Sequence, residues 1–328
     1  MINYKLNFLL LFISLIYLLN IKFFSRKLKL IDYAKNKSHI FDTPKYGFIF
    51  FILILIPLFT NTFKDIESNF NSLIFSIYIS LFLILGYLDD LYNLSVNKRI
   101  IFALLLSLTF FIYFKDLFYV SVGFPSWLNI LLLTFFTLGF VHLINITDGI
   151  NGLIISLYVY SLIYFSLKIN FQFTFFQENI ILTSFILSPL FILANFMGKC
   201  FMGNTGSYLV AIIISLIYIE IFPSSKLEYS DILSIYFVPL LDGLRVTIMR
   251  VLDKRSPFVG DLSHLHHIVK KRKIYTFFFF VIIFFPSIFN FFFQEYSLLI
   301  FIIFFIVYCF FLKFLSGNKL HDNPRVSL

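Results

Sequence analysis

Long apolar stretches alternate with short polar connections along the whole chain. Each stretch is about as long as a helix needs to cross the hydrocarbon core of a bilayer. No tandem repeat or low-complexity linker interrupts the pattern, which predicts an all-α, polytopic integral membrane protein with about eleven transmembrane helices in a single domain over residues 1–328. The first stretch lacks a small-residue cleavage site, so we expect a membrane span rather than a signal peptide. The predicted stretches are 5–24, 46–63, 72–88, 100–115, 127–144, 152–168, 179–196, 208–224, 232–247, 274–293 and 298–315.

The composition excludes the other broad classes of protein. Hydrophobic residues make up 60% of the chain, charged residues only 13%, and the mean hydropathy is +0.92. A soluble chain is about 25% charged, so neither a soluble surface nor a disordered chain can be built from this sequence. The two cysteines, Cys200 and Cys309, indicate neither a disulfide framework nor a thiolate metal site.

The distribution of charge predicts the orientation in the membrane. The connections 22–45, 89–99, 145–151, 197–207, 242–273 and the tail from 313 contain 21 of the 26 Lys and Arg residues and nine of the 17 acidic ones. By the positive-inside rule this side is cytoplasmic, the amino terminus is outside and the carboxyl terminus is cytoplasmic. The net charge of +9 therefore reflects topology rather than nucleic-acid binding. We expect a multi-pass protein of the cell inner (cytoplasmic) membrane, with its chemistry in the cytoplasmic loops 26–45, 89–99, 145–151, 197–207 and 242–273.

Two adjacent carboxylates, Asp89 and Asp90, close the third stretch. Adjacent carboxylates at a membrane boundary repel each other unless a cation lies near them, and acidic residues at such depths are usually functional. A solvated helix end is the alternative. The functional hypothesis is a site for Mg²⁺ or phosphate, with Lys98 and Arg99 close enough to meet an anion.

Three further polar segments follow on the same predicted face. Asn145 and Asp148 are three residues apart, which places them on one side of a helix. The glycine-rich segment 197–207, with Lys199 and Ser207 before a helix, could hold phosphate, although a simple cytoplasmic turn is the more common use of such a segment. The segment from Asp242 to His267 is the largest.

That largest segment combines basic residues with three of the six histidines. Zinc could be held by Asp261, His264 and His266, but no matching His or Cys cluster occurs elsewhere. Imidazoles together with Arg245 and Arg250 suit a diphosphate, which they would bind by charge-assisted hydrogen bonds.

In this order and on one face, these segments resemble the polyprenyl-phosphate N-acetylhexosamine-1-phosphate transferase superfamily (glycosyltransferase family 4). The resemblance extends from about Lys37 to His267. The ending Asp261-x-x-His264-x-His266-His267 is more similar to the bacterial UDP-GlcNAc:undecaprenyl-phosphate branch than to the muramoyl-pentapeptide branch. Its parts are Lys37-Ser38-His39 with Thr43-Pro44-Lys45-Tyr46-Gly47, Asp89-Asp90, Asn145 to Leu153, Phe201 to Ser207, and Ser256-Pro257-Phe258 to His267.

The resemblance implies an Mg²⁺-dependent phosphotransferase that moves a sugar 1-phosphate from a UDP-N-acetylhexosamine to undecaprenyl phosphate and releases UMP. Such a step starts a cell-surface glycan: an O-antigen, a capsule or a cell-wall polymer. Mn²⁺ could replace Mg²⁺, and the family is compatible with a homodimer. A divalent cation and basic groups would screen the two reacting anions.

The resemblance also implies roles for individual residues. Asp89 would contact or activate the lipid phosphate, and His264 would complete a catalytic group with Asp89, Asp90 and Asp148. The metal would be held by Asp90, Asp148 and Asn204. Binding of the diphosphate, sugar or nucleotide would fall to Lys98, Asn145, Lys199, Arg245, Asp261, His266 and His267.

The sequence departs from the family pattern at three positions. Asn204 stands where the glycine-rich motif has an Asp that serves as a metal ligand, Asn151 replaces a second Asp, and Phe48 replaces a second Gly. An Asn oxygen can coordinate Mg²⁺ but without the charge. Two alternatives therefore stay open: a catalytically silent relative that binds lipid or nucleotide sugar, and a membrane transporter, although transporters place their charged sites nearer the middle of the membrane.

Overall fold

The computed structural model describes residues 4–33, 42–64, 66–67, 69–116, 118, 123–224, 227–256, 263–269 and 273–317. These residues are almost entirely helical, which confirms the predicted all-α class. The exception is a two-stranded antiparallel sheet, in which β1 (Ile31–Asp32) pairs with β2 (Thr43–Pro44). The chain divides into two compact units, Met1–Leu227 and Glu228–Leu328, and each is described by itself. The single domain that we expect over residues 1–328 stays a prediction.

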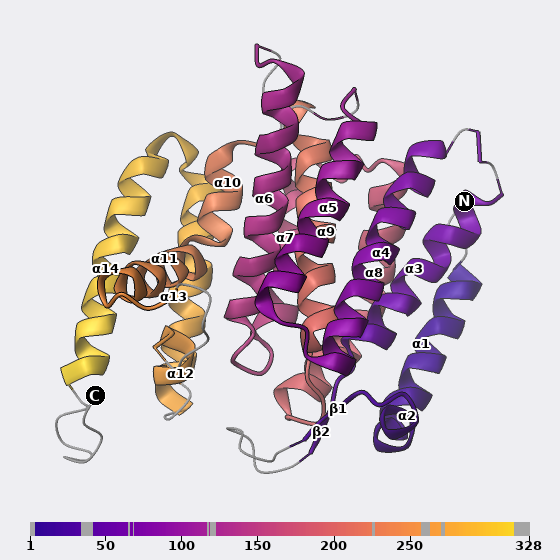
Figure 1. Ribbon diagram of the computed structural model, residues 1–328, viewed down its shortest axis with the longest axis horizontal. Helices are drawn as coiled ribbons and strands as arrows, with labels where there is room; N and C mark the ends of the chain where they lie inside the picture. The colour runs from indigo at the N-terminus through magenta and orange to yellow at the C-terminus, as the bar shows by residue number, and fades with distance from the viewer. Residues whose placement is uncertain are drawn as a thin grey trace. The chain divides into compact units, whose positions relative to one another are not determined.

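The first unit contains nine α-helices within its described residues (Figure 1). They are α1 (Tyr4–Leu19), α2 (Ile21–Lys27), α3 (Gly47–Thr62), α4 (Phe70–Tyr92), α5 (Val96–Tyr113), α6 (Ser126–Thr147), α7 (Leu153–Lys168), α8 (Phe175–Phe196) and α9 (Gly203–Ile221), followed by the 3₁₀ turn η1 (Phe222–Ser224). The second unit contains α10 (Tyr229–Ile235), α11 (Phe237–Leu252), α12 (Leu265–Val269), α13 (Lys273–Phe292), the 3₁₀ turn η2 (Gln294–Tyr296) and α14 (Ser297–Gly317).

Each of the eleven predicted apolar stretches coincides with a helix or a bent pair of helices. Within the described residues, six helices are long and apolar enough to cross a membrane, and eight spans result if each bent pair counts as one. The two bent pairs are α1 with α2, at 87°, and α10 with α11, at 73°. The protein is therefore a multi-pass membrane protein, whereas the count of eleven spans and the orientation stay predictions.

Helix α9 is the core of the first unit. Every residue from Thr205 to Ile219 is buried, which explains why this helix is apolar on all sides. It packs against α3, α4, α6 and α7. Its contact with α4 is unusually close, because a Cβ atom on Gly86 would lie 2.5 Å from the Cα of Thr205.

The predicted polar segments of the first unit gather at one end of its helices. The connections that follow α4, α6 and α8 lie at the lower end in Figure 1, on the side where β1 and β2 lie. Backbone hydrogen bonds join the last of these connections to the segment between α2 and α3: Phe201 N–H donates to the Pro44 carbonyl, and Tyr46 N–H donates to the Phe201 carbonyl. The fold thus brings segments far apart in sequence to the end of α4 that carries the two aspartates.

Candidate active site

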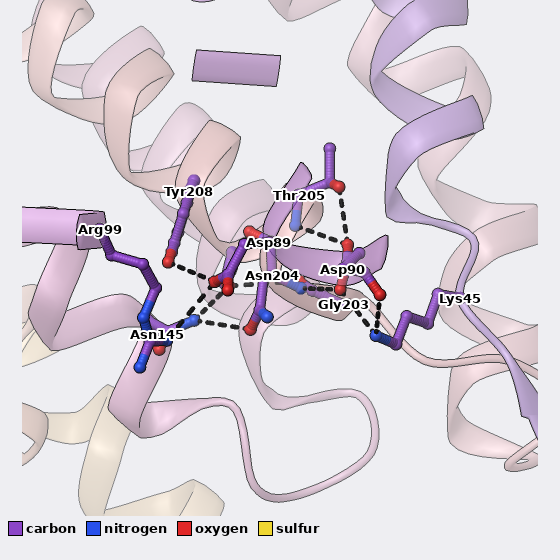
Figure 2. Close-up of polar contacts among 10 residues, drawn as sticks. Lys45, Asp89, Asp90, Arg99, Asn145, Gly203, Asn204, Thr205 and Tyr208 are labelled. Carbon is purple, nitrogen blue, oxygen red and sulfur yellow. Dashed lines mark hydrogen bonds and ion pairs between the residues drawn. The ribbon is translucent and has the colours of Figure 1, made fainter. Parts of the chain in front are cut away.

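The two adjacent aspartates at the end of α4 point in opposite directions (Figure 2). Asp89 is 1% exposed and faces Tyr208 of α9 and Arg99 of α5. The Tyr208 hydroxyl donates to Asp89 Oδ2 at 2.7 Å, and Arg99 Nη1 lies 3.4 Å from the same oxygen. The Tyr208 phenol and the Arg99 guanidinium thus stabilise the buried carboxylate of Asp89, which lies in the last turn of α4.

Asp90 turns the other way and accepts four hydrogen bonds. Its Oδ1 accepts from Lys45 Nζ and from the Asn204 backbone N–H, both at 2.9 Å. Its Oδ2 accepts from the Thr205 backbone N–H at 2.9 Å and from Thr205 Oγ1 at 2.7 Å. Asp90 therefore ties α4 to the first turn of α9 and to Lys45.

Gly203 makes this contact sterically possible. Its φ of +75° lies in the left-handed region that favours glycine, and a Cβ there would lie 2.9 Å from Asp90 Oδ2. The first turn of a helix has unpaired N–H groups that need an acceptor. The glycine-rich segment thus lets the start of α9 approach a carboxylate from another helix.

A second polar contact joins α6 to α9. Asn145 Nδ2 donates to Asn204 Oδ1 and to Ser207 Oγ, each at 3.1 Å. Asp89, Asp90, Asn145 and Asn204, which the sequence predicts to share a site, therefore lie in one cluster (Figure 2). We call Lys45, Asp89, Asp90, Arg99, Asn145, Asn204, Thr205, Ser207 and Tyr208 the carboxylate cluster.

Three other predicted residues of the first unit are more exposed than the aspartates of this cluster. Lys98 in the first turn of α5, Asp148 directly after α6 and Lys199 between α8 and α9 are exposed. Asp148 follows α6 directly, and its backbone N–H donates to the Asn145 carbonyl at 3.4 Å. These side chains are accessible to a ligand, whereas Asp89 and Asp90 are enclosed.

Neighbouring loops are held by side-chain contacts that the sequence pattern alone does not explain. Asn195 accepts from the Gly152 N–H and donates to the Cys200 carbonyl, both at 2.6 Å, so it ties together the loops before α7 and α9.

Phe48, which replaces a family glycine, stacks on Tyr87 with ring centroids 4.3 Å apart. The Phe at position 48 therefore packs α3 against α4.

The second unit holds its own polar cluster around Asp242. This carboxylate accepts from Arg245 Nη2 at 2.7 Å, the Leu265 N–H at 3.1 Å and the Tyr308 hydroxyl at 3.2 Å. His264 Nδ1 lies 3.0 Å from Asp242 Oδ2, the oxygen that also accepts from the Leu265 N–H. Asp242 thus fixes one ring nitrogen of His264 and leaves Nε2 for another partner.

Two more predicted histidines lie beside His264. The rings of His264 and His266 stack with centroids 5.5 Å apart, and those of His266 and His267 are 4.1 Å apart. Arg245, His264, His266 and His267 are therefore brought together within the second unit. Asp261 and the Lys37-Ser38-His39 segment lie outside the described residues.

Sequence reasoning missed several members of these clusters. Tyr208 reads as an apolar helix residue, and Tyr308 lies deep in the last apolar stretch. Lys45 and Thr205 lie in motifs that resemble the family, but the resemblance does not imply a role for either residue. Only Arg99, beside Lys98, gave a signal, as a cation close to the aspartate pair.

The predicted Mg²⁺ ligand set does not fit this arrangement. A carboxylate has about four lone-pair positions, and all four of Asp90 are used by protein donors. The side-chain oxygen of Asn204 already accepts from Asn145. In the described part of the chain, no group of three His, Cys, Asp or Glu side chains is placed to hold a metal ion.

Together these features define a multi-pass helical membrane protein with a buried carboxylate pair at one end of its helices. Residues 72–222 match the family model of glycosyl transferase family 4. This segment contains both aspartates and the whole of α9, so the part of the chain that holds the carboxylate cluster is similar to that family. The Thr43 to Gly47 segment and the histidine segment lie outside the matched residues.

The chain is also similar to three curated proteins. The undecaprenyl-phosphate alpha-N-acetylglucosaminyl 1-phosphate transferase of Escherichia coli O157:H7 is 26% identical over 203 residues, 57% of this chain and 55% of the relative. The protein of that name from Thermotoga maritima is 26% identical over 251 residues, 76% of each chain. The phospho-N-acetylmuramoyl-pentapeptide-transferase of Listeria monocytogenes is 26% identical over 190 residues, 50% of this chain and 57% of the relative. The chain thus spans about half the length of the E. coli and Listeria relatives.

Proposed function

We propose that the protein transfers N-acetylhexosamine 1-phosphate from a UDP-sugar to undecaprenyl phosphate, with release of UMP. The observation that carries the proposal is the carboxylate cluster, whose members other than Lys45 lie within the segment that matches glycosyl transferase family 4. The names of the E. coli and T. maritima relatives support undecaprenyl phosphate as acceptor and an N-acetylglucosaminyl phosphate as the transferred group. The step would start a cell-surface glycan.

The reaction joins two anions. An oxygen of the lipid phosphate forms a bond to the phosphorus attached to the sugar, and the bond from that phosphorus to the UMP oxygen breaks. UMP leaves with the electron pair. Positive charge near the reacting phosphates lowers the cost of this approach, and Lys98, Arg99 and Lys199 can supply it from the end of the helices that carries the cluster.

We assign the contact with the lipid phosphate to Asp89, as the family resemblance implies, although this residue is only 1% exposed before substrate binds. Tyr208 and Arg99 fix its orientation from α9 and α5, so its carboxylate is preorganised before a substrate arrives. Its position at the end of an apolar helix suits a substrate whose phosphate lies at the membrane surface. We assign to Asp89 the orientation of the attacking phosphate.

Several finer features of this function rest on the sequence. The charge asymmetry supports a cytoplasmic active site in the inner membrane, and the His264 cluster of the second unit would contribute to diphosphate binding. The need for Mg²⁺ or Mn²⁺ and a homodimer are implied by the family resemblance. No step of the proposed reaction is assigned to the ion, because the predicted ligand set does not fit.

The experiment that tests the function is a panel of substrates. Purified protein in detergent is incubated with undecaprenyl phosphate, Mg²⁺ and one UDP-sugar at a time, and the lipid product is identified by mass spectrometry. We expect one or more UDP-N-acetylhexosamines to give a lipid-linked sugar diphosphate together with UMP. Absence of both products across the panel contradicts the proposal.

A catalytically silent relative is the second candidate, because Asn204 removes a charge that the family pattern has. The Asn204→Asp variant separates the two. The new carboxylate can still accept from Asn145 and restores the charge that the family pattern has. If the protein is active, the variant should therefore retain or exceed the wild-type rate at low Mg²⁺. A silent relative would bind UDP-sugar or lipid yet turn over in neither form.

A further inference from the structure

We propose that Asp90 is a positioning residue that caps the amino terminus of α9 from another helix, rather than a metal ligand. The helix has no cap of its own: Met202 occupies the N-cap position and makes no side-chain cap hydrogen bond. Ser, Thr, Asp or Asn normally fills that position and accepts from the second or third backbone N–H of the helix. In this protein the acceptor comes from α4.

The hydrogen bonds match those of an N-cap. Helix α9 begins at Gly203, so Asn204 and Thr205 are its second and third residues. Both backbone N–H groups donate to Asp90 at 2.9 Å, one to each carboxylate oxygen. The negative charge also interacts favourably with the positive end of the helix dipole.

The remaining acceptor positions of Asp90 are filled by side chains. Lys45 Nζ and Thr205 Oγ1 occupy them at 2.9 and 2.7 Å. With Asp90 7% exposed, a metal ion could bind it only by displacing one of these donors. Because protein donors fill the lone pairs of Asp90, a structural role in positioning is favoured.

Asp90 positions the adjacent residue, Asp89. Gly86, one helical turn before Asp90, lies against the backbone of Thr205, so the cap and the glycine contact together fix α4 against α9. Asp89 then faces Tyr208, which lies further along the same helix. The backbone pairing of the Pro44 to Gly47 segment with Phe201 and Met202 adds Lys45 to the assembly.

Three variants test the assignment. Asn caps helices about as well as Asp, so Asp90→Asn can keep part of the cap, whereas Asp90→Ala keeps none. Thr205→Val removes one donor and leaves the carboxylate intact. The matched controls are Asp116→Asn, an exposed carboxylate that follows the far end of α5, and Thr109→Val, whose hydroxyl donates to the Leu105 and Leu106 carbonyls of its own helix.

The first measurement is hydrogen exchange of the peptide containing Asn204 and Thr205. We expect exchange at least tenfold faster in Asp90→Ala, an intermediate increase in Asp90→Asn and Thr205→Val, and wild-type exchange in both controls. Wild-type protection in Asp90→Ala overturns the proposal. If that variant does not fold, wild-type protection in both Asp90→Asn and Thr205→Val overturns it.

The second measurement, UMP release as a function of Mg²⁺ concentration, rests on the proposed function. A positioning role predicts that Asp90→Asn retains at least tenfold more activity than Asp90→Ala, with half-saturating Mg²⁺ within twofold of wild type. Equal losses in both variants, with half-saturating Mg²⁺ raised tenfold or more, overturn it. If the wild-type protein releases no UMP, the proposed function fails while hydrogen exchange still decides the capping role.

Discussion

At the scale of single residues, identity and position along the chain do not reveal which partner a side chain meets. Asp89 and Asp90 are adjacent and chemically identical, yet one faces Tyr208 and the other caps α9. The sequence could predict that both belong to a site, because paired acids at a membrane boundary are rarely incidental. It could not divide their roles, because the backbone N–H groups that Asp90 caps lie more than a hundred residues away.

Asp242 in the second unit is, like Asp90, a buried carboxylate that accepts several hydrogen bonds. It is 7% exposed and holds Arg245, His264 and the start of α12. We expect Asp242→Asn to lower the free energy of unfolding by about 1.5–3 kcal/mol, since hydrogen bonds to a buried charge contribute that much. The measurement is the melting temperature in detergent.

The control for Asp242 is Asp253→Asn. Asp253 pairs with Arg255 on the surface, where both side chains are more than half exposed. Exposed ion pairs contribute about 1 kcal/mol or less. Equal melting temperatures for the two variants would show that Asp242 does not organise its surroundings.

At the scale of helices, the apolar pattern predicts nearly all of the architecture. All eleven stretches are helical, since backbone groups in a bilayer must pair internally. The pattern does not predict the bends at Asn20 and Tyr236, because the apolar character continues across both breaks. It also does not predict which helices touch, since lipid-facing and protein-facing surfaces are equally apolar.

The contact between α4 and α9 depends on Gly86. A methyl group there would lie 2.5 Å from the Cα of Thr205, so Gly86→Ala should force the helices apart and disturb both Asp89 and Asp90. We expect UMP release to fall at least tenfold and the melting temperature to drop.

Gly139 in α6 provides the matched control. Nothing lies within 4 Å of a Cβ at this position, so Gly139→Ala should keep its activity and gain up to about 1 kcal/mol of stability from helix propensity. If Gly86→Ala behaves like Gly139→Ala, the close packing of α4 and α9 is not required.

At the scale of the whole molecule, the distribution of charge carries the prediction of topology. Asn97 lies in the first turn of α5 and Ser126 is the first residue of α6, and both are exposed. These two helices start at opposite ends of the first unit (Figure 1). The positive-inside rule predicts that Asn97 is cytoplasmic and Ser126 is outside. This orientation cannot be deduced from helix packing, which is the same whichever side faces the cytoplasm.

Cysteine labelling of intact cells tests the orientation. In a Cys309→Ser background, an impermeant maleimide should label Ser126→Cys directly, and Asn97→Cys only after permeabilisation. The remaining Cys200 is buried, and burial raises the pKa of its thiol to about 12, so it should not react. The reverse labelling pattern would place the carboxylate cluster outside the cell.

The most direct measurement of the central claim is the stoichiometry of the two products in wild type and Asp89→Asn. Purified wild-type protein should release one UMP for each lipid-linked N-acetylhexosamine formed, and Asp116→Asn should do the same. Asp89→Asn should lower both products together by at least a hundredfold, because the buried carboxylate that orients the lipid phosphate is lost. Wild-type turnover by Asp89→Asn, or UMP release without a lipid product, would contradict the account.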